Sequence, residues 1–135
     1  MNAVDTNILI YTHDPRDEIK QAAAVALVGT LPDGVLLWQV ACEYVAASRK
    51  LAAYGHNQRA AWQELRRLRG TWTTAVPSWE VAERAEELLT RYNLSFWDAM
   101  IVAACLESGV TRLYSEDFDN SAAATGLEII NPFAS

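Results

Sequence analysis

The chain has 135 residues, a length typical of one compact domain, and we expect a single domain over residues 1–135 with no linker. Its residues are 51% hydrophobic and 21% charged, which excludes a disordered chain, and no apolar run approaches the roughly 18 residues needed to cross a bilayer. Eleven basic and seventeen acidic residues give a formal net charge of −6, which argues against a protein that coats nucleic acid through a uniformly basic surface.

The first residues lack the basic start and the cleavage site of a secretion signal. We therefore expect a cytoplasmic protein with no membrane contact. The two cysteines and the two histidines lack the spacing of metal ligands, so a disulfide or a zinc site is not expected.

Short apolar runs alternate with longer helical patterns along the chain. In chain order, the pattern predicts a strand at 2–5, a short helix or turn at 6–12, a helix at 17–31, a strand at 35–38, helices at 40–51 and 57–69, a strand at 72–76, a helix from 77–78 to about 92, a helix at 97–108, and strands at 111–114 and 128–130. Asn57 and Ser95 are expected to cap helices, and Gly70 and Gly109 to end them. Strands that are apolar on both faces and alternate with helices predict an α/β fold with a parallel sheet covered on both sides.

Four carboxylates fall where such a sheet binds ligands, at the carboxyl ends of its strands. Asp5 ends the first strand, and Glu43 lies in the first turn of the helix that follows the second. Asp98 lies in the first turn of the helix at 97–108, and Asp117 follows the fourth strand. The sequence therefore predicts that four separate segments bring acids to one edge of the sheet.

Three of these acids also have simple structural interpretations. Asp5 could cap the following helix by accepting a hydrogen bond from the backbone of residue 7 or 8. Glu43 could be a salt-bridged surface acid, although no cation stands three or four positions away on its helix. Asp117 and Asp119 belong to a run of acids that is typical of a solvated loop.

Asp98 is the most informative of the four. Ser95-Phe96-Trp97-Asp98 fits a capping box, which is its structural interpretation. Residues 99–106 are apolar all round, which predicts a helix buried in the protein and a partly desolvated carboxylate on its first turn. Such burial costs several kcal/mol unless a cation or hydrogen-bond donors compensate, and a helix N-terminus supplies only about 0.3–1 kcal/mol. The sequence offers no cation beside it.

A divalent cation would resolve this accumulation of negative charge. Like charges at close range raise one another's pKa and destabilise the fold, and a metal ion reverses that effect. Oxygen ligands without histidine or cysteine suit Mg²⁺ or Mn²⁺ better than Zn²⁺. We therefore expect Mg²⁺ (or Mn²⁺) to be held by Asp5, Glu43, Asp98 and Asp117.

Five ordered stretches carry a family resemblance that covers nearly the whole chain. They are residues 4–7 (Val-Asp-Thr-Asn), 41–44 (Ala-Cys-Glu-Tyr), 97–104 (Trp-Asp-Ala-Met-Ile-Val-Ala-Ala), 113–118 (Leu-Tyr-Ser-Glu-Asp-Phe) and 130–133 (Ile-Asn-Pro-Phe). Together they resemble the PIN-domain ribonucleases, specifically the VapC-type toxins of type II toxin–antitoxin systems.

The resemblance implies a three-layer α/β/α sandwich with a central parallel sheet of about five strands, and metal-dependent endonucleolytic cleavage of RNA. The family's acidic residues match Asp5, Glu43, Asp98 and Asp117, which are therefore the candidate catalytic and metal-holding residues. Positions that support the site match Thr6, Asn7, Ser115 and, as a further acid, Asp119. Asp119-Asn120 stands where many relatives carry a glycine, so the role of Asp119 stays open. The resemblance also implies a small VapB-type antitoxin that covers the groove, and a homodimer.

A basic segment is the candidate for drawing RNA to such an acidic site. Six of the eleven basic residues, against the single acid Glu64, stand in it: Arg49, Lys50, Arg59, Arg66, Arg67 and Arg69. Tyr54 and Trp62 could stack bases, whereas Trp38, Trp72, Trp79 and Trp97 are expected to pack in the core or in an interface. The segment could equally be a solvated helical face, or could dock an acidic partner or a second copy of the chain.

The predicted reaction is hydrolysis of RNA by water activated on one or two Mg²⁺ ions held by the carboxylates. A haloacid-dehalogenase-like phosphatase with Asp5 as nucleophile is less favoured, because Asn7 stands where that family needs a second aspartate and no lysine has matching context. A non-catalytic protein-binding module of the same fold is the alternative from another class, and it predicts no binding of Mg²⁺ or Mn²⁺.

Overall fold

The computed structural model describes residues 1–118 and 125–134. Its central feature is a parallel sheet of five strands in the order β3-β2-β1-β4-β5. The strands are β1 (Asn2–Val4), β2 (Gly34–Leu37), β3 (Thr73–Ala75), β4 (Arg112–Tyr114) and β5 (Glu128–Ile130). The predicted α/β fold with a parallel sheet is confirmed, with the ends of each strand within one residue of the prediction.

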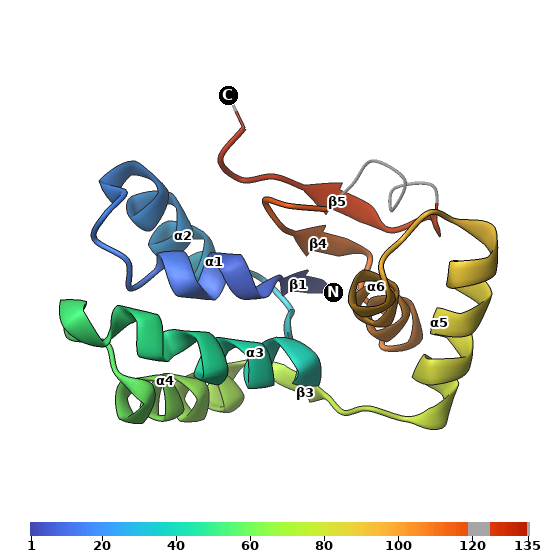
Figure 1. Cartoon of the computed structure of the whole chain (residues 1–135), viewed down its shortest axis with the longest axis horizontal. Helices are drawn as coiled ribbons and strands as arrows, with labels where there is room; N and C mark the ends of the chain where they lie inside the picture. Colours follow the sequence, from blue (N-terminus) through green and yellow to red (C-terminus); the bar gives the residue numbers. More distant parts are fainter. Residues whose placement is uncertain (119–124, 135) are drawn as a thin grey trace.

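Helices cover both faces of this sheet. They are α1 (Thr6–Tyr11), α2 (Glu18–Thr30), α3 (Trp38–Ser48), α4 (Gln58–Thr71), α5 (Trp79–Arg91) and α6 (Phe96–Glu107). The chain moves from β1 to β2 to β3 in one direction and then returns across the sheet to β4, so right-handed crossovers place α1–α4 on one face and α5 and α6 on the other. Figure 1 shows this division, which makes the fold a three-layer α/β/α sandwich.

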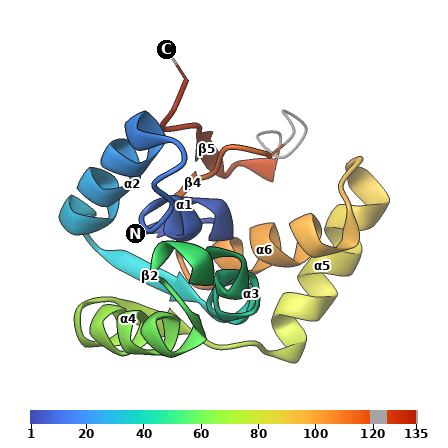
Figure 2. The same cartoon turned by 60° about the vertical axis from the view of Figure 1, so that its left-hand side comes forward.

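The helix α6 is the buried helix that its sequence predicts. Its side chains at 99, 101–103 and 105 are buried on several sides of the helix, and it contacts both β2 and α5. Figure 2 shows α6 between the sheet and α5. In contrast, α5 buries one face, with Val81, Ala85 and Leu88, and exposes the other. None of the helices in the described residues is long and apolar enough to span a membrane.

The helix caps follow the sequence closely at their N-termini. The backbone N–H of Ala60 donates to Asn57 Oδ1 at 2.9 Å, and that of Asp98 donates to Ser95 Oγ at 3.2 Å, so both predicted caps are confirmed. Gly70 does not end its helix as predicted, because α4 continues to Thr71. The Trp72 N–H closes the last turn on the Leu68 carbonyl at 2.7 Å.

Two boundaries around the second strand also differ from the prediction. Trp38 begins α3 and does not end β2. The helix predicted at 40–51 is α3 up to Ser48, followed by a 3₁₀ helix over Arg49–Tyr54. Gly55 ends this 3₁₀ helix at a φ of +90°, a conformation that glycine adopts without strain. The change of helix type turns the chain between α3 and α4.

Candidate active site at the carboxyl edge of the sheet

The pairing of β1 with β4 builds the centre of the site. Val4 is in register with Tyr114, so the residues that follow the two strands, Asp5 and Ser115, are neighbours at the carboxyl edge. The Asp5 N–H donates to the Tyr114 carbonyl at 2.8 Å, and the buried Ser115 Oγ donates to Asp5 Oδ2 at 2.8 Å. The predicted supporting residue Ser115 therefore fixes the Asp5 carboxylate directly.

Asp5 is the N-cap of α1, and the donor to its carboxylate differs from the predicted one. Its Oδ1 accepts the backbone N–H of Thr6 at 2.7 Å, and not that of residue 7 or 8. Burial raises the pKa of Asp5, and the negative charges of Glu43 and Asp98 raise it further, although the hydrogen bonds from Ser115 and Thr6 act in the opposite direction. Asp5 is thus a carboxylate held in place at an electrostatic cost.

Glu43 reaches the same edge from α3. Its Oε2 accepts a hydrogen bond from Thr6 Oγ1 at 3.3 Å, and its Oε1 accepts one from Gln39 Nε2 at 2.8 Å. Gln39 Nε2 also donates to the Trp97 carbonyl at 3.4 Å, which connects α3 to the first turn of α6. Glu43 is exposed, and its partners are neutral.

Asp98 lies at this edge because α6 leads into β4 and runs opposite to the strands. The N-terminus of α6 therefore sits at the carboxyl ends of the strands, with Asp98 in its first turn and Ser95 as its cap. Within the described part of the chain, the partly exposed Asp98 carboxylate has no ion pair. The sequence offers Asp98 no neighbouring cation, and the described residues of the folded chain do not supply one either.

Asp117 follows β4 and is held by α1. Asn7 Nδ2 donates to Asp117 Oδ2 at 3.1 Å, and the Asp117 N–H donates to Ser115 Oγ at 3.3 Å. The adjacent Glu116 forms an ion pair with Lys20 instead, so the run of acids separates into a paired and an unpaired carboxylate. Asp119 lies outside the described residues.

These acids line one groove of about 500 Å³, which we call the acidic groove. The groove-lining carboxylates from the predicted set are Asp5, Glu43, Asp98 and Asp117, together with the predicted supporting residues Thr6 and Asn7. In residues 1–118 and 125–134, none of the four forms an ion pair with lysine or arginine. Nor do any three histidine, cysteine or acidic side chains of those residues lie close enough to hold a metal ion. The four acids therefore line one groove, but their carboxylates are too far apart in the described structure for three of them to hold one ion.

The donors of the acidic groove suit a hard divalent cation in their chemistry. Carboxylate, hydroxyl and amide oxygens are the ligands that Mg²⁺ and Mn²⁺ prefer. Asn7 adds a second observation, because its Oδ1 is buried and has no hydrogen-bond partner in the structure. A buried amide oxygen without a donor is costly unless a cation or water meets it. The chemistry of these donors therefore fits Mg²⁺ or Mn²⁺, although no three of the acids in the described residues lie close enough to hold an ion.

The predicted basic segment meets the acidic groove at one residue. Lys50 lines the groove, whereas Arg67 pairs with Glu64 and lines a separate hollow beside Trp72. The remaining members lie exposed outside the lining of the groove: Arg49, Arg59, Arg66 and Arg69. Their predicted contact with RNA stays a prediction.

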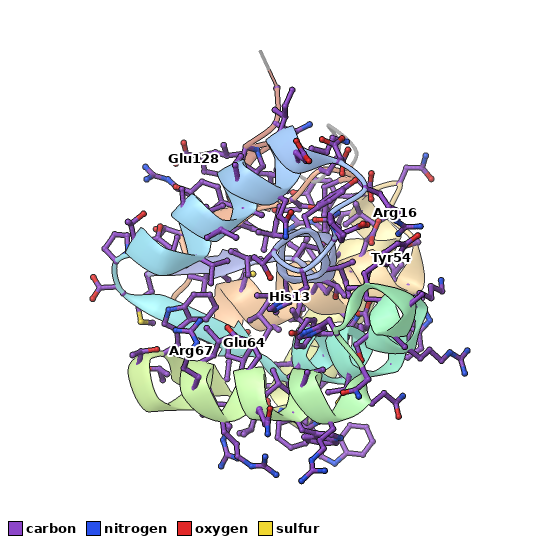
Figure 3. All side chains as sticks on the ribbon, turned by 90° about the vertical axis from the view of Figure 1, so that its left-hand side faces the viewer. His13, Arg16, Tyr54, Glu64, Arg67 and Glu128 are labelled. Carbon is purple, nitrogen blue, oxygen red and sulfur yellow. The ribbon has the colours of Figure 1, made fainter. Side chains whose placement is uncertain are left out.

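Arg16 is a groove-lining cation that the sequence reasoning missed. Its Nε and Nη2 donate to the two carboxylate oxygens of Asp14 at 2.9 and 2.8 Å, and its guanidinium lies 5.2 Å from the Tyr54 ring centroid. Figure 3 shows Arg16 beside Tyr54. The signal was Asp14-Pro15-Arg16, an aspartate-led turn in which the Arg16 N–H donates to Asp14 Oδ1 at 3.1 Å.

With this geometry in place, the comparisons with known proteins assign the family. The PIN-domain family model matches residues 3–125, and the chain belongs to that family. No curated protein sequence matches the chain.

Solved structures with similar folds cover almost the whole chain. A chain of a toxin–antitoxin complex from Klebsiella pneumoniae is 25% identical, with a TM-score of 0.70 and 98% of each chain covered. VapC20 of Mycobacterium tuberculosis, described as a sarcin-ricin loop cleaving toxin, is 20% identical with a TM-score of 0.66, covering 94% of this chain and 96% of that one. FitAcB from Neisseria gonorrhoeae is 18% identical with a TM-score of 0.68, covering 98% and 99%.

Proposed function

We propose that this PIN-domain protein is a metal-dependent endoribonuclease and the toxin of a VapBC-type toxin–antitoxin pair. The observation that carries the proposal is the acidic groove, in which four carboxylates from four separate segments face one space without a neutralising ion pair among the described residues. Membership of the PIN-domain family supports a nuclease, and the similarity to a chain of the Klebsiella toxin–antitoxin complex supports the toxin role.

The proposed cofactor is Mg²⁺ or Mn²⁺, held by Asp5, Asp98 and Asp117 with Glu43 beside them. Burial, and after it the negative charges of Glu43 and Asp98, raises the pKa of Asp5, and such an ion would oppose this shift. It would also supply positive charge at the scissile phosphate and a water of lowered pKa. Ser115 and Thr6 hold Asp5 in place, whereas Glu43 and Asp117 are exposed.

The chain's own residues have separate tasks in this reaction. Ser115 and Thr6 hold the Asp5 carboxylate in one orientation, and Asn7 does the same for Asp117. Gln39 holds Glu43 and the Trp97 carbonyl, which fixes α3 relative to the first turn of α6. A ligand set fixed in this way does not need to be reorganised when phosphate charge develops in the transition state.

The proposed partners are an RNA substrate, a small VapB-type antitoxin and a second copy of the chain. The antitoxin would inhibit by covering the acidic groove. A homodimer follows from the family resemblance, and its test is the molar mass of the purified protein in solution.

The test is cleavage of RNA by the purified chain with Mg²⁺, Mn²⁺ or EDTA. We expect cuts only with the divalent ions, and no 2′,3′-cyclic phosphate ends, because the attacking group is water and not the neighbouring 2′-hydroxyl. Asp98→Asn should lower the rate at least about 100-fold, while Glu83→Gln, an equal change of charge at an exposed position of α5, should leave it unchanged.

Calorimetric titration separates the nuclease from a non-catalytic binding module of the same fold. The wild-type chain should bind Mn²⁺, and Asp98→Asn should bind it more weakly. Cleavage that persists in EDTA, or an Asp98→Asn variant as active as the wild type, would contradict the proposal.

A further inference from the structure

Trp97 is an exposed residue in the lining of the acidic groove. It stands directly before Asp98 and is 63% exposed. The Phe96 ring meets it edge-on, with ring centroids 4.9 Å apart and an interplanar angle of 81°, and the Trp97 carbonyl accepts the hydrogen bond from Gln39. The indole is therefore supported from one side and open on another.

Packing in the core or in an interface is the predicted role of Trp38, Trp72, Trp79 and Trp97. Trp72 is buried in the core, whereas the other three are exposed, and their packing in an interface stays a prediction. Trp97 is the tryptophan that lines the acidic groove; Trp79, at the start of α5, is 82% exposed and lies outside it. Trp79 is therefore a matched control for exposure without the groove.

Two cations line the same groove. Arg16 is fixed by the fork of hydrogen bonds to the buried Asp14 and by the Tyr54 ring, so that little side-chain entropy is left to lose on binding. Lys50 comes from the 3₁₀ helix and is exposed. Arg16 has N–H groups beyond the two that Asp14 accepts, which can bind an anion.

A ligand that fits this lining carries both flat rings and repeated negative charge. The carboxylates of the groove repel phosphates, so a polyanion binds there only if cations lie beside the carboxylates. An exposed indole binds most favourably to a planar base that stacks on it. In a duplex the bases stack on one another and leave no face for Trp97. A strand with unpaired bases offers both contacts at once.

We propose that Trp97, Arg16 and Lys50 position the RNA substrate in the acidic groove, with one base stacked on Trp97 and backbone phosphates on Arg16 and Lys50. The choice of RNA rests on the proposed function, whereas the assignment of these three residues rests on the exposed Trp97 and the two groove-lining cations. Trp97 and Arg16 are substrate-positioning residues in this proposal.

The experiment measures binding without cleavage. Fluorescence anisotropy follows a labelled single-stranded oligoribonucleotide, its perfect duplex, and the same strand with abasic residues, all in EDTA. Trp97→Ala should weaken binding of the single strand about 5- to 100-fold, the range of base–aromatic stacking, and Trp97→Phe should recover most of that loss. Trp97→Ala should leave the binding of the duplex and of the abasic strand unchanged. The control Trp79→Ala should not change the binding of any of the three RNAs.

The cations are tested through salt dependence. Arg16→Gln and Lys50→Gln should each reduce the slope of log Kd against log salt by about one, for the normal and the abasic strand alike. Arg91→Gln, at an exposed position in the last turn of α5 outside the groove, is the control for a loss of charge elsewhere. Circular dichroism verifies that the variants are folded.

Loss of either contact, or a different ligand, overturns the proposal. No binding of RNA by the wild type, or an equal loss with Trp97→Ala for normal and abasic strands, removes the stacking contact. Binding of poly-glutamate that depends on the same three residues, in place of RNA, makes the groove a protein-docking site. A chain that binds unpaired RNA through Trp97 but does not cleave it with Mg²⁺ or Mn²⁺ overturns the nuclease and not this inference, and the reverse result overturns only this inference.

Discussion

Two hollows of similar size lie at opposite edges of the sheet, and they differ in how their charges are met. The acidic groove, at the carboxyl edge, has a volume of about 500 Å³ and four acids without an ion pair in the described part of the chain. The second hollow, at the amino ends of β2 and β3, has about 410 Å³, and its Arg67 is neutralised by Glu64. Volume alone does not indicate a site; uncompensated charge on a fixed framework does.

The second hollow is built for packing. The Trp72 indole lies against Gly34, where a Cβ atom would come within 2.5 Å of the Trp72 ring. The positive φ of the turn belongs to Asp33, at +47°, so Gly34 is required for this close approach and not for the turn. The acidic groove has the opposite character, since its centre, Asp5, is held in place at an electrostatic cost.

The largest expected effect is on RNA cleavage, and it should come from neutralising the partly buried Asp5 carboxylate. Asp5→Asn should lower RNA cleavage at least about 100-fold, because a neutral amide is a poor ligand for Mg²⁺. The same change should raise the melting temperature in EDTA. The folded pKa of Asp5 lies above its unfolded value of 3.8, so the stability linked to this group declines as the pH rises through these values and is low at neutral pH.

The measurement is a thermal melt in EDTA beside an assay of RNA cleavage. Added Mg²⁺ should raise the melting temperature of the wild type and should have less effect on Asp5→Asn. Loss of both activity and stability would mean that Asp5 is a structural cap and no more. In that case Asp5 would stabilise the fold, as the packing residues of the second hollow do, and the contrast between the two hollows would be wrong.

Much of the contrast could be predicted from local sequence. The capping residues Asn57 and Ser95, the apolar stretch 99–106 and the alternation of strands and helices each act over a few residues, and each is confirmed. The arrival of Asp5, Glu43, Asp98 and Asp117 at one groove follows from the direction of parallel strands, which the alternation also predicts.

The errors arise where tertiary contacts decide. The helix α4 continues past Gly70 because Trp72 closes its last turn. Trp72 is held there by its packing against Gly34 of β2, a contact between residues far apart in the sequence. The groove-lining role of Arg16 depends on Asp14 and Tyr54 together, and Tyr54 reaches it through the 3₁₀ helix, a change of helix type that periodicity does not reveal. Sequence spacing grouped six cations that the fold then separated, with Lys50 alone at the groove.

Gly34→Ala should damage the second hollow and spare the first. Overpacking against the Trp72 ring should lower the free energy of unfolding by about 1–3 kcal/mol, measured by urea denaturation. Gly70→Ala is the matched control, because a Cβ atom there meets nothing within 4 Å and α4 should gain roughly 0.5–1 kcal/mol. Cleavage per folded molecule should stay at the wild-type level in both, and a specific loss of activity in Gly34→Ala would show that the two edges are coupled.

A stacked pair of histidines, one partly buried and one buried, should make the free energy of unfolding depend on pH. His13 and His56 stack with ring centroids 3.6 Å apart, and the Tyr44 hydroxyl lies 2.8 Å from His56 Nε2. Burial, with the charge of His56, lowers the pKa of His13 to about 4, and burial lowers the pKa of His56 as well; nearby Glu64 opposes both shifts. His13 is partly buried, and His56 is buried; Figure 3 labels His13.

The sign follows from the unfolded pKa of 6.5, which lies above the folded value of about 4 for His13. The stability is fully present above pH 6.5 and declines as the pH falls toward 4, by about 1.3 kcal/mol for His13 between pH 7.5 and 5.5. Urea denaturation at these two pH values measures it, and His13→Phe, which keeps an aromatic ring without a titrating group, should lose that part. An equal pH dependence in His13→Phe and the wild type would assign the effect to other groups.

The smallest effect should come from the ion pair that neutralises the second hollow. Arg67 is largely exposed, with its Nε 3.1 Å from Glu64 Oε1, and exposed pairs of this kind contribute about 0.2–1 kcal/mol. Arg67→Gln with Glu64→Gln in a double-mutant cycle, followed by urea denaturation, gives the coupling energy.

Because Arg67 lies at the second hollow and not at the acidic groove, Arg67→Gln should leave the salt slope of RNA binding unchanged, whereas Lys50→Gln should reduce it by about one. A reduced slope for Arg67→Gln would extend the RNA path along α4 to the second hollow, and the two edges of the sheet would then belong to one binding surface.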